Sequence, residues 1–186
     1  MKLPQDIYRV YKNATCLYTK EQVEQALDRL AQEIRYNLED KNPVLLTVMV
    51  GGMIPAAHLL TRIDFPLELD YAHATRYQSG VEGKELIWKN EPSTKLKERT
   101  VLILDDILDG GLTLMAVKKY CEAQGTKQVQ TAVLVDKQGT RLEGGLAKAD
   151  YTGLTIEDYY VFGYGMDYYE YLRNAPGIYA VSTEDL

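Results

Sequence analysis

The chain is 186 residues long, a length that suits one domain with a full hydrophobic core. Its formal net charge of −6 argues against nucleic acid as the main partner, because surfaces that bind nucleic acid are basic. No apolar run approaches the roughly 20 residues that span a membrane, and Cys16 and Cys121 form neither a disulfide framework nor a metal-binding spacing. We therefore expect a cytoplasmic protein that binds neither nucleic acid nor membrane.

The first clear element is a helix that starts after Thr19. Thr19 and Gln22 have the spacing of a capping box, in which each side chain bonds to the backbone of the other residue. Apolar residues then recur at helical spacing from Val23 to Leu38. This pattern predicts an amphipathic helix that packs on the core and has no chemical role.

Two strands follow, separated by a glycine turn and a short helix. Residues 44–50 (VLLTVMV) form an uninterrupted apolar run, which is typical of a parallel strand buried on both faces. Gly51 and Gly52 end this run, and Pro55 suits the first turn of a helix. Residues 67–74 then alternate between apolar and polar side chains, which predicts a strand with one wetter face.

The two histidines and a long charged segment belong to the same region. His58 lies in the predicted short helix and His73 in the following strand, and neither has a partner spaced for a catalytic triad or a zinc site. We therefore interpret both histidines as structural. The segment at 78–97 is charged, and it is long for a loop inside a compact domain. We therefore predict a mobile lid with Arg76 and Tyr77 at its root.

One stretch, residues 101–113 (VLILDDILDGGLT), organises the rest of the chain. Its first four residues predict a short buried strand, and Asp105, Asp106 and Asp109 follow that strand in an acidic loop. A glycine pair then leads into a pattern with helical spacing, which Gly125 ends. The order is strand, acidic loop, glycine turn and helix.

These residue types point to a ligand that carries phosphate, adjacent hydroxyls and a metal. Glycines let the backbone approach a ligand closely, and free N–H groups at a helix N-terminus attract phosphate. The carboxylates would repel phosphate, but they suit sugar hydroxyls or Mg2+. A P-loop is excluded because no lysine follows the glycines in the required order. The alternative is a core strand whose acidic residues are simply solvated.

The last part of the chain adds a further strand and a separate tail. Residues 129–135 predict a strand that delivers Asp136 and Lys137 at its carboxyl end. The remaining predicted segments are a loop at 139–153 and short strands at 161–162 and 178–181. This order of elements predicts an α/β fold with a mainly parallel central sheet flanked by helices, and with its ligand at the carboxyl ends of the strands.

The stretch at 101–113 resembles the phosphoribosyl pyrophosphate (PRPP) signature of type I phosphoribosyltransferases. Four further segments resemble the hypoxanthine-guanine branch of that family, in the order pyrophosphate loop, flexible loop, base-recognition segment and hood: VMVGGM, ATRY, LVDKQ and YVFGYGMDYYEYLR. The resemblance implies the type I phosphoribosyltransferase fold. It also implies a PRPP-binding core at 15–150 and a small purine-binding hood subdomain formed by 1–14 and 151–186.

The resemblance gives a role to each matching residue. It implies that Asp109 is the catalytic base and that Lys137 recognises the purine 6-oxo group. The implied PRPP-binding residues are Asp105, Asp106, Asp109, Gly110, Gly111, Leu112 and Thr113. The other implied contacts are purine binding by Lys137, Tyr160, Val161 and Asp167, pyrophosphate binding by Val50, Gly51 and Arg173, a flexible loop at Arg76 and Tyr77, and Mg2+ ligation by Asp105, Asp106 and Asp167.

The sequence departs from the family pattern at two places. Gly110 and Leu112 stand where relatives often have the threonine and lysine of D-T-G-K-T, which removes a hydroxyl and a positive charge near the phosphate. Backbone N–H groups still supply the anion site, so we expect PRPP to bind with lower affinity. Val50 stands where many relatives have a lysine, and the resemblance implies a non-proline cis bond between Val50 and Gly51.

The resemblance implies transfer of the 5-phosphoribosyl group from PRPP to hypoxanthine or guanine. The products would be IMP or GMP and pyrophosphate in purine salvage, with Mg2+ as cofactor and a homodimer or homotetramer as the assembly. Two alternatives remain: an enzyme of the same fold for another base such as xanthine or uracil, and a PRPP-responsive regulator that binds RNA. Lys137 and the hood segment favour a 6-oxopurine, and the net charge of −6 argues against RNA.

Overall fold

The fold is built on a six-stranded sheet in the order β4-β3-β2-β5-β6-β7. The structure, a computed structural model, describes residues 4–76 and 86–186. Neighbouring strands are parallel except for β3 and β4, so the mainly parallel sheet predicted from the sequence is confirmed. The bounds are β2 (Val44–Val48), β3 (Glu68–Arg76), β4 (Leu86–Asn90), β5 (Thr100–Leu108), β6 (Gln128–Lys137) and β7 (Tyr151–Ile156).

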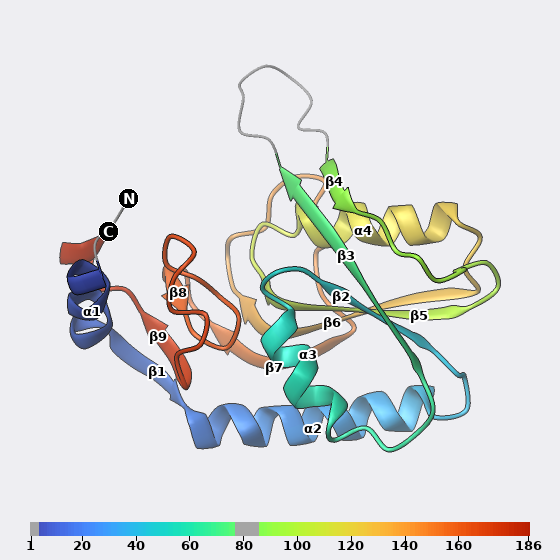
Figure 1. Cartoon of the computed structure of the whole chain (residues 1–186), viewed down its shortest axis with the longest axis horizontal. Coiled ribbons are helices and arrows are strands. Elements are labelled where there is room, and N and C mark those ends of the chain that lie inside the picture. The colour runs from blue at the N-terminus through green and yellow to red at the C-terminus, as the bar shows by residue number, and fades with distance from the viewer. Residues whose placement is uncertain (1–3, 77–85) are drawn as a thin grey trace.

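Helices cover both faces of this sheet (Figure 1). α2 (Lys20–Leu38) and α3 (Met53–Leu60) lie on one face, and α4 (Leu112–Ala123) lies on the other. Successive residues of a strand point to opposite faces, so Leu45 packs in the core beneath α2 and α3 while Leu46 packs in the core beneath α4. Both faces therefore need apolar side chains, which explains the uninterrupted apolar run in β2. No helix in the described ranges is long and apolar enough to cross a membrane.

The start of α2 confirms the predicted capping box. The Gln22 N–H donates to Thr19 Oγ1 over 3.4 Å, and the Thr19 N–H donates to Gln22 Oε1 over 2.9 Å. Two backbone donors that would otherwise lack partners are satisfied in this way. The apolar residues that recur from Val23 to Leu38 form the buried face of the helix.

β5 and β6 extend further than the sequence predicts. The expected acidic loop is wrong, because β5 continues through Asp105 and Asp106 and its pairing with β6 reaches Leu108 opposite Asp136. Lys137 is likewise the last residue of β6 and does not lie beyond it. These charged side chains are therefore held by regular strands, which fixes their positions more firmly than a loop would.

β2, in contrast, ends earlier than predicted, at Val48. The N–H of the next residue, Met49, donates to the Ala72 carbonyl at 2.8 Å, and the chain then turns toward α3. The non-proline cis peptide joins Met49 to Val50, so the prediction of a cis bond between Val50 and Gly51 is wrong by one residue. The loop before α3 therefore starts at Met49.

β7 occupies an edge of the sheet where the sequence predicts a loop through Gly153. From Tyr151 onward the chain pairs in parallel with β6, so the loop prediction is wrong at its carboxyl end. A Cβ at Gly153 would lie 2.8 Å from the Leu134 carbonyl oxygen, so glycine allows the two strands to approach. Glycine inside a strand interrupts the side-chain pattern by which strands are recognised.

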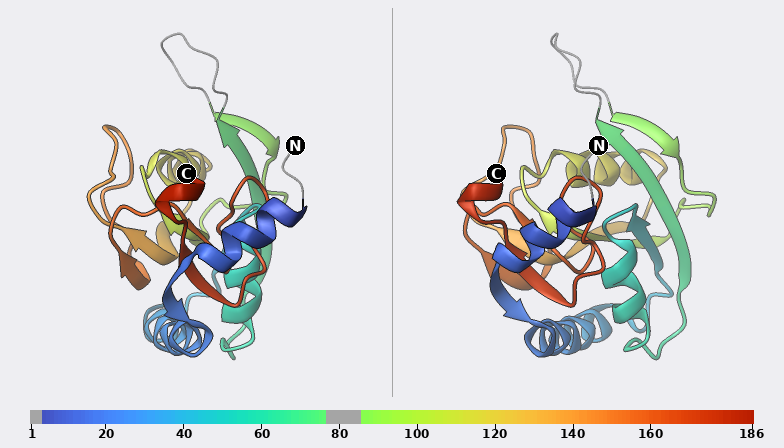
Figure 2. Two further views of the ribbon diagram at one scale, coloured as in Figure 1. Left: turned by 90° about the vertical axis from the view of Figure 1, so that its left-hand side faces the viewer. Right: turned by 60° about the vertical axis from the view of Figure 1, so that its left-hand side comes forward.

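A smaller sheet of order β1-β9-β8 stands beside the main sheet (Figure 2). We call its strands, the loops between residues 157 and 177, and the terminal helices the hood. The buried residues of its own core are Ile7, Val10, Phe162, Tyr168, Ala175 and Val181. The elements are α1 (Pro4–Asn13), β1 (Thr15–Thr19), β8 (Val161–Phe162), β9 (Gly177–Ala180) and a 3-10 helix (Thr183–Asp185).

The membership of the two sheets differs from the predicted division of the chain. β1 belongs to the hood sheet, although the predicted boundary between residues 14 and 15 assigns it to the PRPP-binding core. β7 belongs to the main sheet, although the predicted boundary between residues 150 and 151 assigns it to the hood subdomain. The predicted lid at 78–97 is only partly open to description, because residues 77–85 lie outside the described ranges. From Leu86 the chain forms the edge strand β4, so the described part of the predicted lid begins as a strand.

The hood meets the main sheet at a close backbone contact. Gly165, in the loop after β8, has a φ of +111°, and a Cβ there would overlap the Gly51 carbonyl oxygen and lie 3.1 Å from Asp106 Cβ. Only glycine combines that backbone conformation with so close an approach. Gly165 therefore fixes the distance between the hood and the loop after β2.

We expect Gly165→Ala to lower the free energy of unfolding by roughly 2–5 kcal/mol, because strain at positive φ adds to overpacking. Gly139→Ala is the matched control: Gly139 has a φ of +77°, but a Cβ there would meet nothing within 4 Å. The control should lose only about 1–2 kcal/mol. Urea denaturation of both variants measures the difference, and equal losses would contradict the contact.

Candidate active site

A cleft of about 570 Å³ opens at the carboxyl ends of the central strands. It is lined by the last residues of β2, β5 and β6, by the turn before α4 and by hood residues around Tyr160 and Met166. An α/β sheet binds its ligand at this edge, because polar groups at the strand ends and helix N-termini meet there. The structure thus offers a cleft in which residues singled out from the sequence can act together.

Most of the residues with a predicted role line this cleft. They are Val50, Gly51, Asp105, Asp106, Asp109, Gly110, Gly111, Thr113, Lys137, Tyr160, Val161, Asp167 and Arg173. Leu112 does not line it and instead starts α4. Arg76 ends β3, but its side chain and the whole of Tyr77 lie outside the description.

Two carboxylates are buried side by side at the floor of the cleft. Asp105 and Asp106 are only 8% and 7% exposed. Asp105 Oδ1 accepts a hydrogen bond from the Asp106 N–H at 2.9 Å, and Asp106 Oδ1 accepts one from the Ile107 N–H at 2.7 Å. Burial raises the pKa of Asp105 well above its ordinary value and repulsion from Asp106 raises it further; burial also raises the pKa of Asp106. The pair thus lacks a nearby cation strong enough to cancel its charge, although Arg173 offsets part of it.

This carboxylate pair suits a cation that brings most of its own ligands. Within the described residues, no three histidine, cysteine or acidic side chains converge closely enough to hold a metal ion by themselves. Mg2+ commonly takes one or two carboxylates and completes its shell with substrate oxygens and water. Asp105 and Asp106 fit that donor set, whereas Asp167 is engaged with Arg173 at 2.8 Å.

The turn before α4 presents backbone groups to the cleft. Gly111 is the N-cap residue of α4 and has a φ of +78°, and a Cβ on it would lie 2.5 Å from the Leu146 carbonyl oxygen. The positive φ and the close contact with Leu146 both require glycine at this position. Thr113 in the first turn of α4 lines the cleft, so the N-terminal end of the helix lies at the cleft wall, where an anion site at a helix N-terminus would be.

Lys137 and Asp109 form an ion pair across the cleft. The Lys137 side chain is 10% exposed, and its Nζ lies 3.1 Å from Asp109 Oδ2 and 3.7 Å from Asp158 Oδ1. Asp136, the neighbour of Lys137 in sequence, pairs with Arg141 instead. The ammonium group therefore points into the cleft and not toward its neighbour in sequence.

The hood contributes an aromatic ring and an anchored arginine. Tyr160 is 40% exposed at the cleft, and its ring centroid lies 5.7 Å from that of Tyr168. Arg173 Nη1 donates to the Gly165 carbonyl at 2.7 Å, while its Nη2 lies 2.8 Å from Asp167 Oδ1. These bonds hold the arginine against the wall formed by the hood.

Arg141 is a positioning residue that the sequence reasoning missed. Its Nη1 donates to the carbonyls of Leu108, Asp109 and Lys137 at 2.9, 2.6 and 2.8 Å, and its Nη2 pairs with Asp136. One guanidinium group therefore joins the end of β5 to the end of β6. Several donors in a fixed planar array suit arginine to this task. No local pattern reveals it, because its partners are backbone carbonyls brought near by the fold.

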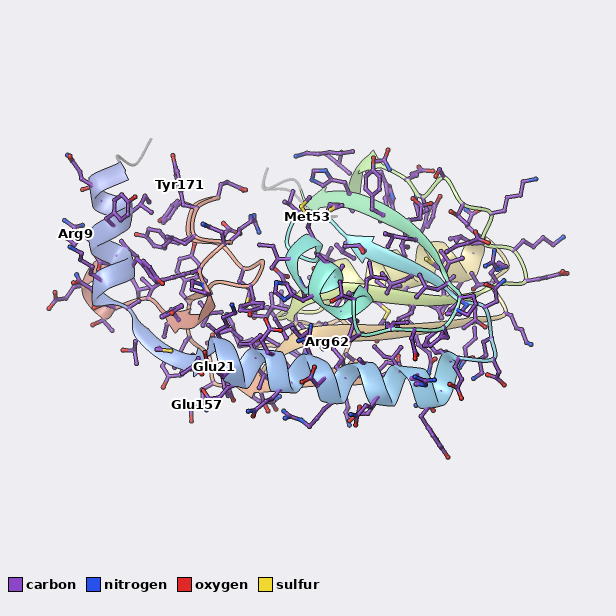
Figure 3. The ribbon with its side chains drawn as sticks, turned by 60° about the horizontal axis from the view of Figure 1, so that its bottom comes forward. Arg9, Glu21, Met53, Arg62, Glu157 and Tyr171 are labelled. Carbon is purple, nitrogen blue, oxygen red and sulfur yellow. The ribbon has the colours of Figure 1, made fainter. Side chains whose placement is uncertain are left out.

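A second network ties the hood to the helices. Glu24 on α2 accepts hydrogen bonds from the Tyr164 hydroxyl and from Arg62, and Arg62 Nε donates to Asp28 at 2.6 Å. Figure 3 shows Arg62 between α3 and α2. His58 joins the same network, with its Nδ1 3.1 Å from Glu24 Oε1, in keeping with the structural role expected of it. His73, in contrast, lines the cleft.

Comparison with known proteins places the chain in a family. Residues 13–170 match the family described as phosphoribosyl transferase domain. Over 169 residues the chain is 31% identical to a hypoxanthine-guanine phosphoribosyltransferase of Streptococcus pneumoniae, which covers 90% of this chain and 93% of the relative. The chain belongs to the hypoxanthine-guanine phosphoribosyltransferase family.

Another relative and a solved structure agree with this placement in the phosphoribosyltransferases. The hypoxanthine-guanine-xanthine phosphoribosyltransferase of Tritrichomonas foetus is 30% identical over 162 residues, covering 87% of this chain and 88% of the relative. The crystal structure of a hypoxanthine phosphoribosyltransferase from Staphylococcus aureus has a TM-score of 0.87 at 27% identity and covers 94% of this chain and 95% of that chain. The fold implied by the sequence resemblance is thus confirmed.

In this phosphoribosyltransferase, Asp105→Asn should raise the free energy of unfolding at pH 7 by about 1 kcal/mol or more. The pKa of Asp105 is higher in the folded state than in the unfolded state, so the ionised carboxylate opposes folding above the folded-state pKa. This penalty shrinks as the pH falls and is lost below about 3.9, the unfolded value, because both states then hold the proton. Asparagine does not titrate, so its advantage should shrink in acid.

Urea denaturation of wild type and variant near pH 7 and near pH 4 measures this effect. Asp40→Asn serves as the control because Asp40 is exposed. The free energy of unfolding of this variant should stay within about 0.5 kcal/mol of that of wild type. A variant less stable than wild type at pH 7 would show that the buried carboxylate does not oppose folding.

Proposed function

We propose that the chain transfers the 5-phosphoribosyl group of PRPP to hypoxanthine or guanine, giving IMP or GMP and pyrophosphate in purine salvage. The observation that carries this proposal is the pairing of Lys137 with Asp109 across the cleft at 3.1 Å. Asp109 belongs to the stretch that resembles a PRPP signature, and Lys137 to the segment that resembles the base-recognition strand of the family. A purine at this pair would meet a proton acceptor and a hydrogen-bond donor together.

The reaction breaks the bond between C1′ of PRPP and a pyrophosphate oxygen, and the pyrophosphate leaves with the electron pair. A purine ring nitrogen forms the new bond to C1′, and the ring then loses a proton. Asp109 would accept that proton as the general base. Its carboxylate is 51% exposed, and Asp109 directly follows Leu108, the last residue of β5, so a regular strand would hold it near the reacting atoms.

PRPP would be held by backbone groups and by the buried carboxylates. The N–H groups of the turn at 110–113 would bind the 5-phosphate at the start of α4. Asp105 and Asp106 would accept hydrogen bonds from the ribose hydroxyls and take part in holding Mg2+. When bound, Mg2+ supplies positive charge against the pyrophosphate oxygens.

Lys137 would select 6-oxopurines over adenine. Its Nζ donates only, and a 6-oxo group accepts, whereas the amino group of adenine offers the lysine no acceptor. With adenine bound, the nearly buried ammonium would be left without an acceptor, which costs on the order of 1–3 kcal/mol of binding free energy. This cost would discriminate 6-oxopurines from adenine. Tyr160 would cover the ring face, and main-chain groups of Val161 would meet the purine edge.

One assay tests the proposal directly: purified protein with PRPP, Mg2+ and each nucleobase in turn, scored for nucleotide and for pyrophosphate. Product with hypoxanthine or guanine supports it. Product only with xanthine or uracil would assign a different base. Binding of PRPP and RNA without turnover would favour a regulator.

We further propose that the enzyme acts in the cytoplasm as a homodimer or homotetramer. Both cysteines are free, which suits a reducing compartment. Two apolar side chains on β3 support an oligomer, since Leu69 is 58% and Tyr71 43% exposed. Sedimentation velocity on the purified protein would measure the assembly, and a monomer across the working concentrations would contradict it.

Asp109→Asn should lower turnover by about 10²–10⁴-fold, the range for loss of a general base. PRPP affinity should change little, because the phosphate cradle is backbone. Asp158→Asn is the matched control, since Asp158 also lies near Lys137, at 3.7 Å, but is 74% exposed. Steady-state kinetics of both variants gives the comparison, and unchanged turnover in Asp109→Asn would remove it from the catalytic role.

Lys137→Ala should raise the Michaelis constants for guanine and hypoxanthine at least tenfold, or by about 1.4 kcal/mol, with the constant for PRPP little changed. Lys127→Ala is the control, because Lys127 is exposed just before the opposite end of β6. Kinetics with each base decides the outcome. Base constants within about twofold of wild type would contradict the 6-oxopurine assignment and leave the PRPP site standing.

A further inference from the structure

A β-bulge lies at the rim of the cleft, where β3 and β4 pair. His73 pairs with Asn90 and the next residue, Ala74, pairs with Trp88, so Lys89 is one extra residue on β4. A bulge breaks the alternation of a strand and re-aims the side chain of the extra residue. Here both Lys89 and His73 line the cleft.

The charges that line the cleft are unevenly compensated. Lys137 is paired with Asp109, and Arg173 is paired with Asp167 and Glu170. His73 and Lys89 are different: among the described residues, neither has an ion pair or a side-chain hydrogen bond. Lys89 is exposed and His73 is half-buried, so both groups are accessible to a ligand in the cleft.

These two residues line the same cleft as the loop after β2. His73 directly follows Ala72, whose carbonyl accepts the Met49 N–H at 2.8 Å, so β3 passes beside the start of that loop. The loop itself has a valine at position 50 and supplies no side-chain charge. Arg173 of the hood also comes near this loop through Gly165, but it is already paired with Asp167 and Glu170, so the unpaired basic side chains come from β3 and β4.

We propose that His73 and Lys89 bind the pyrophosphate group of PRPP, with Lys89 aimed at it by the bulge. This inference rests on the proposed function, because it names the residues that hold one end of the proposed substrate. A pyrophosphate carries several negative charges, and a cleft lined by five carboxylates needs cations that are not already neutralised. Lys89 supplies a full charge, and the His73 imidazole has an N–H donor in either protonation state.

The competing explanation is that Lys89 only protects the edge of the sheet. Lysines and bulges are common on edge strands because they block pairing with another chain, and β4 is an edge strand. That role needs no ligand and would leave substrate affinity unchanged on substitution. The two explanations therefore differ in a binding measurement.

Titration calorimetry with inorganic pyrophosphate and Mg2+ tests the proposal on the full chain. Lys89→Gln should weaken pyrophosphate binding roughly tenfold, about 1.4 kcal/mol, and His73→Gln should also weaken it. Lys89→Arg keeps the charge and should restore most of the affinity. Lys95→Gln is the matched control, since Lys95 is exposed on the same connection but does not line the cleft.

Binding of GMP gives the second readout, because a nucleoside monophosphate fills the base and 5-phosphate positions and leaves the pyrophosphate position empty. GMP affinity should stay within about twofold in both variants. Unchanged pyrophosphate affinity in Lys89→Gln and His73→Gln, or an equal loss of GMP affinity, would overturn the inference.

The wild-type protein separates this inference from the proposed function. Wild type that binds pyrophosphate but makes no nucleotide would overturn the proposed function alone, and wild type that does not bind pyrophosphate would overturn this inference.

Discussion

Two neighbouring carboxylates buried at the end of a central strand are the constraint on which the rest of the structure depends. Asp105 and Asp106 cost folding free energy because burial opposes their ionised forms, and their raised pKa values express that cost. A sheet with extensive apolar burial on both faces can carry this cost, and the pair of hydrogen bonds from following N–H groups offsets part of it. The structure therefore retains an unfavourable pair in a cleft where a ligand can reach it.

The carboxylate pair also determines how closely the hood approaches. Asp106 lies against Gly51 on one side and Gly165 on the other, and a Cβ on either glycine would crowd its side chain. Because the contact is made by backbone, it leaves no room for adjustment by side-chain rotation. Glu24 then ties Tyr164, the neighbour of Gly165, to α2 and so supports the contact from outside. The hood is thus positioned by sterics at the cleft and by hydrogen bonds at the helices.

Sequence reasoning found the parts whose signal is local. Periodicity located the central strands and α2, and the stretch at 101–113 identified the cleft, because each signal is contained in a short run of residues. It failed where the outcome depends on a partner strand: β5 and β6 extend each other beyond their apolar runs, and β7 forms although Gly153 interrupts its pattern. Arg141 and the bulge at Lys89 were missed for the same reason, since both are defined by contacts between segments distant in sequence.

The departures of the turn at 110–113 from the family pattern have a structural counterpart in the segment that follows β6. The Leu142 N–H donates to the Gly110 carbonyl at 3.1 Å, and the Leu146 N–H donates to the Gly111 carbonyl at 2.9 Å. A Cβ on Gly110 would lie 2.9 Å from Leu142 Cδ1, so a threonine there would require that leucine to move. Arg141 adds its bond to the Asp109 carbonyl at 2.6 Å. The turn is therefore fixed through its carbonyls, and it lacks the threonine hydroxyl and the lysine charge of the family pattern. A rigidly placed backbone, rather than added side-chain charge, is therefore what this end of the cleft offers to a ligand.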